Sequence, residues 1–193
     1  MRELSLHLLD IAENAIAAGA RHLHISISES LATDSLVMTV QDDGCGMDAE
    51  TLAKVRTPFF TTRTTRDVGL GIPFLAAAAE RCGGGLEISS ELGVGTTVVA
   101  RFQRSHIDRA PLGDVAGALM AILLRGDDER LRLTYEHRIE EWVFAFDTRE
   151  LHDLLGGMSP GDAAVRRWLS EYLARCEQEL KEQSCPRSDL STT

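Results

Sequence analysis

The sequence predicts an α+β fold, a two-layer sandwich in which helices cover one face of a mixed β-sheet. Residues 4–20 repeat apolar side chains at helical spacing, whereas residues 23–29 and 36–42 alternate apolar and polar side chains as strands do. A short link joins the predicted strands over residues 23–29 and 36–42. Residues 86–90 and 96–103 form a second pair of predicted strands joined by a short link. Such hairpin links favour antiparallel neighbours over a doubly wound parallel sheet.

Length, charge and cysteine content exclude several classes of protein. A chain of 193 residues can hold one sizeable core, or one domain with a smaller companion. The net charge of −10 argues against a general nucleic-acid or membrane-surface binder, and no apolar run reaches the roughly 18 residues of a membrane span. The four cysteines lack zinc or CxxC spacing, and no signal-peptide pattern precedes the first helix. We therefore expect a cytoplasmic protein that binds neither nucleic acid nor membranes.

The helix predicted over residues 4–20 carries a wide apolar side and a narrow polar stripe. The polar stripe contains His7, Asp10 and Asn14, with Asp10 and Asn14 one helical turn apart. A polar stripe of this kind is either the solvent face of the helix or one wall of a site. Partners for these residues further along the chain would decide between the two.

The strand over residues 36–42 runs directly into the turn Asp-Asp-Gly-Cys-Gly-Met, residues 42–47. Two glycines in such a turn mark a backbone that needs unusual dihedral angles or close approach of another group. Asp48 follows as the expected N-cap of a short helix over residues 49–55.

A loop and a glycine-opened helix follow. Residues 56–68 are rich in Thr and Arg and show neither strand nor helix periodicity, so they predict a mobile functional loop or a solvated surface loop. Gly69 and Gly71 then precede an alanine-rich helix, whose free N–H groups would suit an anion. Gly93 and Gly95 suit a tight turn in the last hairpin.

From residue 105 the pattern changes, and we expect a domain over residues 1–104 followed by a small α+β companion unit over residues 105–193. Its sequence up to residue 114 resembles a linker, and Trp142, Phe144 and Phe146 alternate as core aromatics would. No chemical constellation stands out in this unit. Its expected elements are helices over 114–125, 148–155 and 162–182 and paired strands over 130–137 and 141–147.

Four ordered motifs in the first 103 residues resemble those of the GHKL superfamily of ATPases, which includes gyrase, heat-shock chaperones, histidine kinases and MutL. Leu-Leu-Asp-Ile-Ala-Glu-Asn-Ala resembles the family's asparagine helix, and Asp-Asp-Gly-Cys-Gly-Met its DxGxG box. Val-Gly-Leu-Gly-Ile resembles the second glycine box, and Gly-Val-Gly-Thr-Thr-Val the final glycine–threonine box. The resemblance implies a Bergerat-type ATP-binding fold for residues 1–104.

On the first helix, the resemblance implies that Asn14 supplies an oxygen to Mg²⁺, a cation that prefers hard oxygen ligands. Asp10 occupies the position where hydrolysing members normally carry a glutamate that orients or activates the attacking group. Aspartate is one methylene shorter, so its carboxylate reaches about 1.5 Å less far. ATP binding is therefore the more secure prediction, and ATP hydrolysis is the less secure one.

For the adenine end, the resemblance implies a carboxylate that accepts a hydrogen bond from the adenine amino group and glycines that let the backbone lie against the base. A threonine of the final box would close this end. The residues assigned in this way are Asp42, Gly44, Gly46, Met47 and either Thr96 or Thr97.

For the phosphate end, the resemblance implies that Gly69, Leu70 and Gly71 cradle phosphates through backbone N–H groups. Residues 56–68 resemble the family's ATP lid. Arg63 and Arg66 of this segment are candidates for neutralising the γ-phosphate.

The function expected is Mg²⁺-dependent ATP binding with slow hydrolysis, used as a regulatory switch toward a protein partner. Two alternatives stay open: a protein kinase that phosphorylates a partner in trans, as anti-sigma kinases of the superfamily do, and a non-catalytic ATP-binding module. Because residue 4 already opens the asparagine helix, we expect no phosphoacceptor hairpin ahead of it. His7, one turn from the metal-binding stripe, is poorly placed as an in-line phosphoacceptor.

Overall fold

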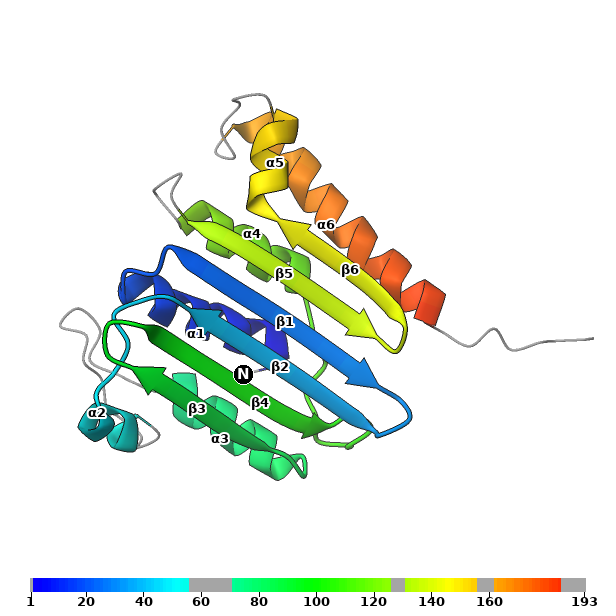
Figure 1. The fold of residues 1–193 in the computed structure, drawn as a ribbon. Coiled ribbons are helices and arrows are strands. Elements are labelled where there is room, and N and C mark those ends of the chain that lie inside the picture. Colours follow the sequence, from blue (N-terminus) through cyan, green and yellow to red (C-terminus); the bar gives the residue numbers. More distant parts are fainter. Residues whose placement is uncertain (1, 56–70, 126–130, 156–161, 185–193) are drawn as a thin grey trace, which may run out of the picture.

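The computed structural model describes residues 2–55, 71–125, 131–155 and 162–184, and within them a six-stranded sheet is packed against a layer of helices (Figure 1). The strands are β1 (His22–Ser30), β2 (Ser35–Asp42), β3 (Gly85–Glu91), β4 (Gly95–Gln103), β5 (Arg132–Ile139) and β6 (Trp142–Asp147). The helices are α1 (Leu4–Ala17), α2 (Ala49–Lys54), α3 (Gly71–Arg81), α4 (Val115–Arg125), α5 (Thr148–Leu155) and α6 (Ala163–Ser184).

The strands are arranged in the order β3-β4-β2-β1-β5-β6. Strand β5 runs parallel to β1, and the other neighbours are antiparallel. The two predicted hairpins are both present, as β1–β2 and β3–β4. The predicted α+β fold with a mixed sheet is therefore confirmed.

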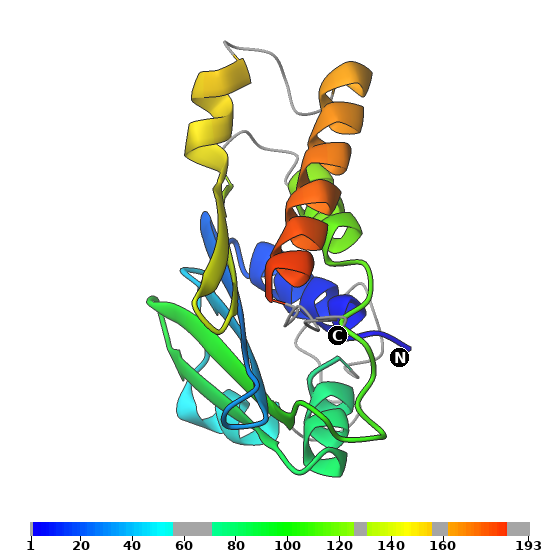
Figure 2. The same ribbon diagram turned by 90° about the vertical axis from the view of Figure 1, so that its right-hand side faces the viewer.

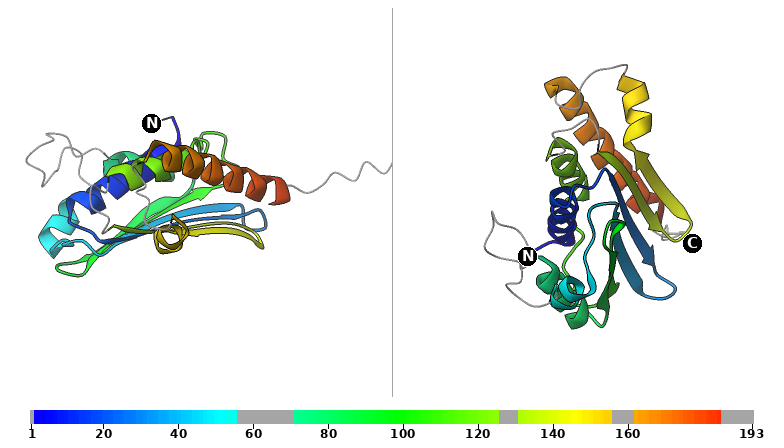
Figure 3. Two further views of the ribbon diagram at one scale, coloured as in Figure 1. Left: turned by 90° about the horizontal axis from the view of Figure 1, so that it is seen from above. Right: turned by 60° about the vertical axis from the view of Figure 1, so that its left-hand side comes forward.

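Helices α1, α3, α4 and α6 form one layer on a single face of the sheet (Figures 2 and 3). Strand alternation points Leu23, Ile25 and Ile27 of β1 toward this layer, where each is at most 1% exposed. On α1, Leu8 and Ile11 face the same core. The single core therefore lies between the sheet and the helices, as the two-layer prediction requires.

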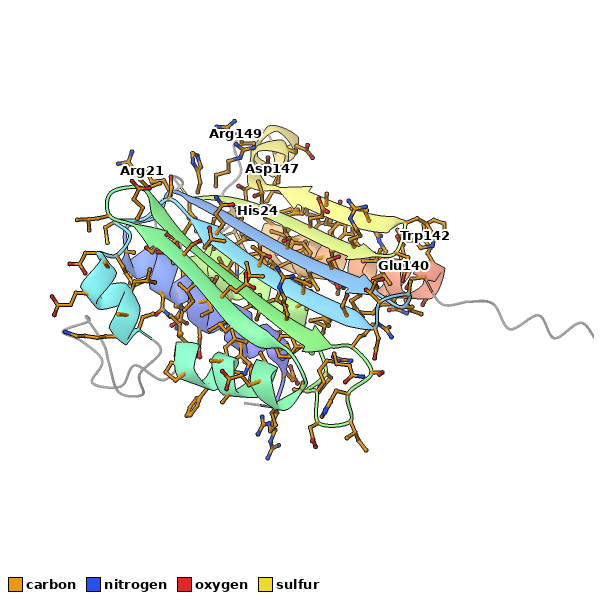
Figure 4. The ribbon with its side chains drawn as sticks, turned by 60° about the horizontal axis from the view of Figure 1, so that its bottom comes forward. Arg21, His24, Glu140, Trp142, Asp147 and Arg149 are labelled. Atoms are coloured by element: carbon orange, nitrogen blue, oxygen red, sulfur yellow. The ribbon has the colours of Figure 1, made fainter. Side chains whose placement is uncertain are left out.

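The opposite face of the sheet carries mainly polar side chains (Figure 4). His24 lies on this face, where its ring Nδ1 is 2.9 Å from the hydroxyl of Thr134. Trp142, which we expected in the core with Phe144, is 40% exposed instead. Trp142 begins the edge strand β6, which has a neighbour on one side only, so strand alternation alone did not bury it.

The sheet continues across residue 104, because β5 pairs with β1. Glu140, between β5 and β6, accepts hydrogen bonds from the backbone N–H groups of Leu31 and Ala32 beyond β1. Arg125 of α4 forms an ion pair of 2.6 Å with Glu13 of α1. The described residues of the C-terminal half thus extend the same two layers, and a division into two domains at residue 104 stays a prediction.

The segment between β4 and α4, expected as a linker, crosses the start of α1. The backbone carbonyls of Pro111 and Leu112 accept hydrogen bonds of 2.9 and 2.8 Å from the N–H groups of Leu4 and Ser5. These N–H groups have no partner within the helix, so the segment satisfies them. None of the helices in the described part of the chain is long and apolar enough to cross a membrane.

Candidate nucleotide-binding site

The turn over residues 42–47 is attached to the C-terminal end of α1. The N–H of Cys45 donates a hydrogen bond of 2.9 Å to the carbonyl of Ala18. A Cβ built on Gly44 would lie 2.9 Å from the Cβ of Ala18, closer than real Cβ atoms approach one another. Glycine is therefore required at this position because the backbone of the turn lies directly against the helix, whereas the expected contact of Gly44 with the adenine base stays a prediction.

The same turn is attached to the β3–β4 hairpin on its other side. The N–H of Gly93 donates a hydrogen bond of 2.8 Å to the carbonyl of Cys45. Gly46 has a φ of +65°, and a Cβ there would lie 2.0 Å from the carbonyl oxygen of Glu91. Three segments that are distant in sequence, namely the end of α1, the turn after β2 and the β3–β4 turn, thus meet at one place.

A serine that the sequence analysis did not identify connects these segments. The Oγ of Ser90 accepts a hydrogen bond of 2.8 Å from the N–H of Met47 and donates one of 2.9 Å to the carbonyl of Gly95. It also lies 2.9 Å from the Oγ1 of Thr96. Since a serine hydroxyl has one hydrogen to donate, Thr96 is the donor in this last bond. The predicted hairpin already implied that Ser90 and Thr96 face each other. This register could have identified Ser90 from the sequence.

Asp42 ends β2 and lies half-buried at the centre of this arrangement. Its Oδ1 accepts a hydrogen bond of 2.9 Å from the N–H of Gly44. Burial raises the pKa of the Asp42 carboxyl above its usual value, although the N–H groups of Gly44 and Thr96 counteract this. A carboxylate has about four lone-pair positions, so these bonds leave capacity for an exocyclic amino group.

Asp43, the next residue, has a structural role. Its Oδ1 accepts hydrogen bonds of 2.7 and 2.8 Å from the N–H groups of Arg21 and His22 at the start of β1, and its Oδ2 lies 3.2 Å from the His22 ring. Burial is the largest single influence and opposes ionisation, but together these N–H donors and the His22 ring hold the pKa of Asp43 below its usual value. The two adjacent aspartates therefore serve different purposes.

The sheet register distinguishes the two candidate threonines. Asp42 pairs directly with Thr96, so both residues point toward the helical layer. Thr97 pairs with Gln41, and both point toward the uncovered face. Of the two threonines, Thr96 is the one that the fold brings next to Asp42.

Of the residues predicted to form the phosphate end of the site, the structure describes Asp10, Asn14 and Gly71. A Cβ built on Gly71, the first residue of α3, would lie 3.3 Å from the Cβ and 3.4 Å from the Oδ2 of Asp10. Asp10 is half-buried, and Asn14 is exposed one turn later on the same helix. The remaining predicted residues of this end, namely Arg63, Arg66, Gly69, Leu70 and the lid over 56–68, lie outside the described residues.

The chemistry of the residues present is compatible with a magnesium–nucleotide ligand. Among the described residues, no group of three or more His, Cys, Asp and Glu side chains could hold a metal ion. Mg²⁺ bound with phosphates needs only one or two protein oxygens and retains water ligands. Asn14, exposed near the Asp10–Gly71 contact, offers such an oxygen.

His7 departs from the predicted polar stripe, because it is buried with 2% exposure. Helix α3 packs along α1, and His7 shares a cavity lining with α3 residues. Burial, together with the positive N-terminus, lowers the pKa of His7 to about 4. Its burial separates His7 from solvent, and the expectation that His7 is no in-line phosphoacceptor stays a prediction.

The fold and the site together define an ATP-binding domain of the Bergerat type: a mixed sheet with helices on one face, with the turn after β2 and the β3–β4 turn meeting at the C-terminal end of α1. Residues 2–106 match the family of histidine kinase-, DNA gyrase B-, and HSP90-like ATPases. The chain belongs to this family. The predicted GHKL resemblance is therefore confirmed, and with it ATP binding as the property of the domain.

Individual proteins resemble the chain over part of their length. A putative sensor protein of Shewanella frigidimarina is 31% identical over 109 residues, which make up 55% of this chain and 17% of that protein. The sensor histidine kinase ZraS of Escherichia coli (strain K12) is 34% identical over 90 residues, 47% of this chain and 19% of ZraS. The chain thus spans less than one fifth of these two sensor proteins.

Among solved structures, the crystal structure of the N-terminal domain of a DNA repair protein has a similar fold. Its TM-score is 0.53 at 11% sequence identity, and the similarity covers 76% of this chain and 52% of that one. Similarity at this level of identity shows the fold alone.

Proposed function

We propose that the chain is a Mg²⁺-dependent ATP-binding regulatory protein that hydrolyses ATP slowly and signals its nucleotide state to a protein partner. The observation that carries this proposal is the position of α1. At its C-terminal end the carbonyl of Ala18 accepts a hydrogen bond from the turn that follows Asp42, and about two turns earlier Asp10 lies near Gly71, the first residue of α3. One rigid helix therefore connects the proposed adenine end with the proposed phosphate end.

The proposed roles follow from the chemistry of the side chains. Asp42 accepts a hydrogen bond from the amino group of adenine, which guanine lacks at the corresponding position because it carries a carbonyl there. Asn14 supplies its amide oxygen to the magnesium ion. Magnesium, when bound, neutralises charge on the phosphate oxygens.

Asp10 is the proposed base that orients an attacking water. Its carboxylate is an acceptor that can hold a water by a hydrogen bond. Gly71 lies close by, since a Cβ built there would be 3.4 Å from the Oδ2 of Asp10. The shorter side chain of aspartate is the reason why we propose slow turnover.

The test compares four variants in MgATP titrations and in phosphate-release assays. Asn14→Ala should lose most of the Mg²⁺-dependent affinity, because it removes the only proposed protein ligand of the ion. Asp10→Asn should bind MgATP but release no phosphate, whereas Asp10→Glu should release phosphate faster than the wild type. Gln41→Ala removes an exposed amide from the uncovered face and serves as the control for Asn14→Ala.

Unchanged MgATP affinity in Asn14→Ala would remove the metal-binding assignment. Phosphate release by Asp10→Asn at the wild-type rate would remove the assignment of the base. The two outcomes are independent, because binding is measured with a nonhydrolysable ATP analogue and therefore without turnover.

A protein kinase acting in trans is the second candidate, and the relatives favour it, since ZraS is named a sensor histidine kinase. Incubation with γ-labelled ATP and candidate partner proteins separates the possibilities. Free phosphate indicates an ATPase, a labelled partner indicates a kinase, and neither product indicates a non-catalytic module.

A further inference from the structure

Strand β6 forms one edge of the sheet, and among the described residues no strand pairs with it on its outer side (Figure 1). Its first five residues, Trp-Val-Phe-Ala-Phe, include no charged residue, proline or glycine. Its pairing with β5 is regular from Trp142 to Asp147. Proteins usually protect an edge with charges, proline, a bulge or a covering element, because its unpaired N–H and C=O groups can pair with another strand. Strand β6 lacks the first three of these protections.

The opposite edge of the sheet, strand β3, is better protected. Glu87 and Glu91 are both exposed on this strand. Helix α2 also packs beside β3. The two edges therefore differ, and β6 is the edge that is open to a further strand.

Aromatic side chains continue from β6 onto helix α6. Trp142 at the start of β6 and Trp168 of α6 are 40% and 46% exposed. The Trp168 ring stacks on Tyr172 with a centroid distance of 5.5 Å, and Tyr172 meets Phe144 of β6 edge-on at 6.4 Å. A single exposed apolar residue is common, but a group of aromatic rings that spans two elements is typical of an interaction site.

The charges along this edge are complementary to those of a second copy. Glu141 is exposed just before β6 begins, and Arg149 is exposed just after β6 ends. Figure 4 shows that Trp142 and Arg149 lie at opposite ends of the strand. When β6 pairs with itself in antiparallel orientation, the end of one copy that carries Glu141 lies beside the end of the other that carries Arg149.

Other charges near the two ends have partners within their own copy. Asp147 is paired with Arg132 of β5 at 2.6 Å. Glu140 accepts hydrogen bonds from the backbone N–H groups beyond β1. Glu150 lies in the first turn of α5, where a negative charge is favourable to its own helix.

The symmetry of such a strand pair restricts its register. Both copies keep their helices on one face of the joined sheet only if residues of the same face lie opposite each other. The two-fold axis at the middle of the strand therefore passes beside Phe144 or beside Ala145. An axis at Phe144 places Glu141 opposite Asp147, and like charges opposite each other destabilise a strand pair. An axis at Ala145 places Glu141 near Arg149 instead, so the charges select Ala145.

We propose that the chain forms a symmetric dimer in which the β6 strands of two copies pair antiparallel about an axis at Ala145. Helix α6 packs against both β5 and β6, so the joined sheet brings the two α6 helices alongside each other, with Trp168 at the junction. A strand of six residues is only about 20 Å long, which gives a contact at the small end of specific interfaces. The dimer therefore dissociates in the micromolar range.

The proposal is independent of the proposed function. Strand β6 and helix α6 lie outside residues 2–106, which match the ATPase family. The test can therefore be made on the full chain without nucleotide, and its failure leaves the proposals for Asp10 and Asn14 unchanged.

Sedimentation velocity from micromolar to millimolar concentration should show a reversible equilibrium of monomer and dimer. Glu141→Arg and Arg149→Glu should each weaken the dimer about tenfold, because each variant places two pairs of like charges at the interface. The double variant should restore the wild-type dissociation constant. Glu87→Arg is the matched control, since it makes the same change at an exposed position of the opposite edge and should have no effect.

Trp168→Ala tests the contribution of the helical layer. The dimer should be about tenfold weaker, because tryptophan side chains supply much of the binding energy at interfaces. Leu92→Ala is the control, since Leu92 is 68% exposed in the turn between β3 and β4, away from β6. Circular dichroism of each variant should match that of the wild type.

A cysteine cross-link tests the register. Ala145→Cys should form a disulfide between two copies under mild oxidation, because residues directly opposite in an antiparallel pair have Cβ atoms about 4.5–5.5 Å apart. Peptide mass spectrometry identifies the bond, so the native cysteines do not obscure it. Ala174→Cys, at an exposed position on another face of α6 than Trp168, should not form one.

A wild type that stays monomeric at millimolar concentration would overturn the proposal, whichever segment or partner then covers the edge. A dimer that Glu141→Arg and Glu87→Arg weaken equally, or that the double variant fails to restore, would overturn β6 as the interface. Absence of the disulfide at residue 145 would overturn the register.

Discussion

The Nδ1 of His137 lies 2.9 Å from the Oε2 of Glu177, so that strand β5 and helix α6 are joined by a fully buried ion pair. On the other side of the ring, the Nε2 of His137 lies 3.4 Å from Glu29 of β1. Arg104, after β4, donates a hydrogen bond of 2.8 Å to Glu29. Tyr135 donates one of 2.7 Å to Glu177. The two carboxylates are thus contacted by the His137 ring and the Arg104 guanidinium.

Removal of His137 should destabilise the protein strongly. His137→Gln leaves two buried carboxylates, with Arg104 beside Glu29 and the charge of Lys181 acting on Glu177 as the remaining cations, and breaking a buried ion pair typically costs about 3–5 kcal/mol. Urea unfolding at pH 6 measures the change. His22→Gln is the control, because the His22 ion pair with Asp43 is largely exposed and should contribute at most about 1 kcal/mol. Equal losses in the two variants would contradict the importance of the buried network.

The contribution of this network should depend on pH. Burial alone would lower the pKa of His137, but hydrogen bonds and charges of Glu177 and Glu29 raise it above 6.5. Burial alone would raise the pKa of Glu177, but His137 holds it below 4.5. The histidine contribution is therefore complete below pH 6.5 and lost as the pH rises through the raised pKa. The glutamate contribution is complete above pH 4.5 and lost as the pH falls through the lowered pKa.

The stability difference between the wild type and His137→Gln should therefore be largest between about pH 4.5 and 6.5 and should narrow on both sides. Urea unfolding of both proteins across pH 4 to 9 gives this difference. A difference that is independent of pH would show that the histidine is not charged in the folded protein.

Protonation of His7 should destabilise the folded protein, whereas protonation of His137 stabilises it. Because burial lowers its pKa from 6.5 to about 4, the unfolded chain binds a proton at this histidine in a pH range where the folded protein does not. The folded state therefore loses stability as the pH falls from 6.5 to 4, on the order of 3 kcal/mol in total. His7→Phe, which removes the titratable ring, should abolish this loss.

Unfolding midpoints of the wild type and His7→Phe between pH 7 and 4 test the prediction, with His22→Phe as the exposed control. The two curves should separate progressively below pH 6.5. Parallel curves for the wild type and His7→Phe would show that His7 titrates normally.

Features of the fold that depend on residues close together in the sequence could be predicted, and features that depend on distant residues could not. Strand alternation and helical spacing are local, so they predicted all six strands and the side of β1 that is buried. The cap at Asp48 is local as well, and its Oδ1 accepts a hydrogen bond of 2.8 Å from the N–H of Thr51. The close approach of backbone segments at the motif glycines could be predicted because only glycine fits at such positions, so the residue type itself marks them.

Long-range partners were not predicted, because spacing does not encode them. His7 has helical spacing with Asp10, yet α3 covers it from 67 or more residues away in sequence. No chemical constellation was expected in the unit that contains His137, yet its pairing with Glu29 and Glu177 brings together three distant elements. The choice between Thr96 and Thr97 likewise needed the register of β4 against β2.

Close approach at Gly46 should make alanine unacceptable there. A Cβ would lie 2.0 Å from the Glu91 carbonyl, in addition to the strain of a positive φ. We expect Gly46→Ala to cost about 2–4 kcal/mol, from about 1 for strain and about 1–3 for crowding. Gly19→Ala is the matched control: its φ is +78° but nothing lies within 4 Å, so it should cost only about 1 kcal/mol. Equal unfolding free energies of the two variants would contradict the crowding.

Thr96 and Thr97 offer a matched pair for the adenine end, because they are adjacent, identical and on opposite faces of β4. Thr96→Val keeps the branched shape but removes the hydroxyl that donates to Ser90 beside Asp42. The expected hydrogen bond between this hydroxyl and the nucleotide, a contact separate from the one to Ser90, is worth about 1.4 kcal/mol, so its loss should lower ATP affinity about tenfold. Thr97→Val should leave the affinity within about twofold. Titration with a fluorescent ATP analogue measures both, and equal effects would show that the face of the sheet does not decide which threonine serves the nucleotide.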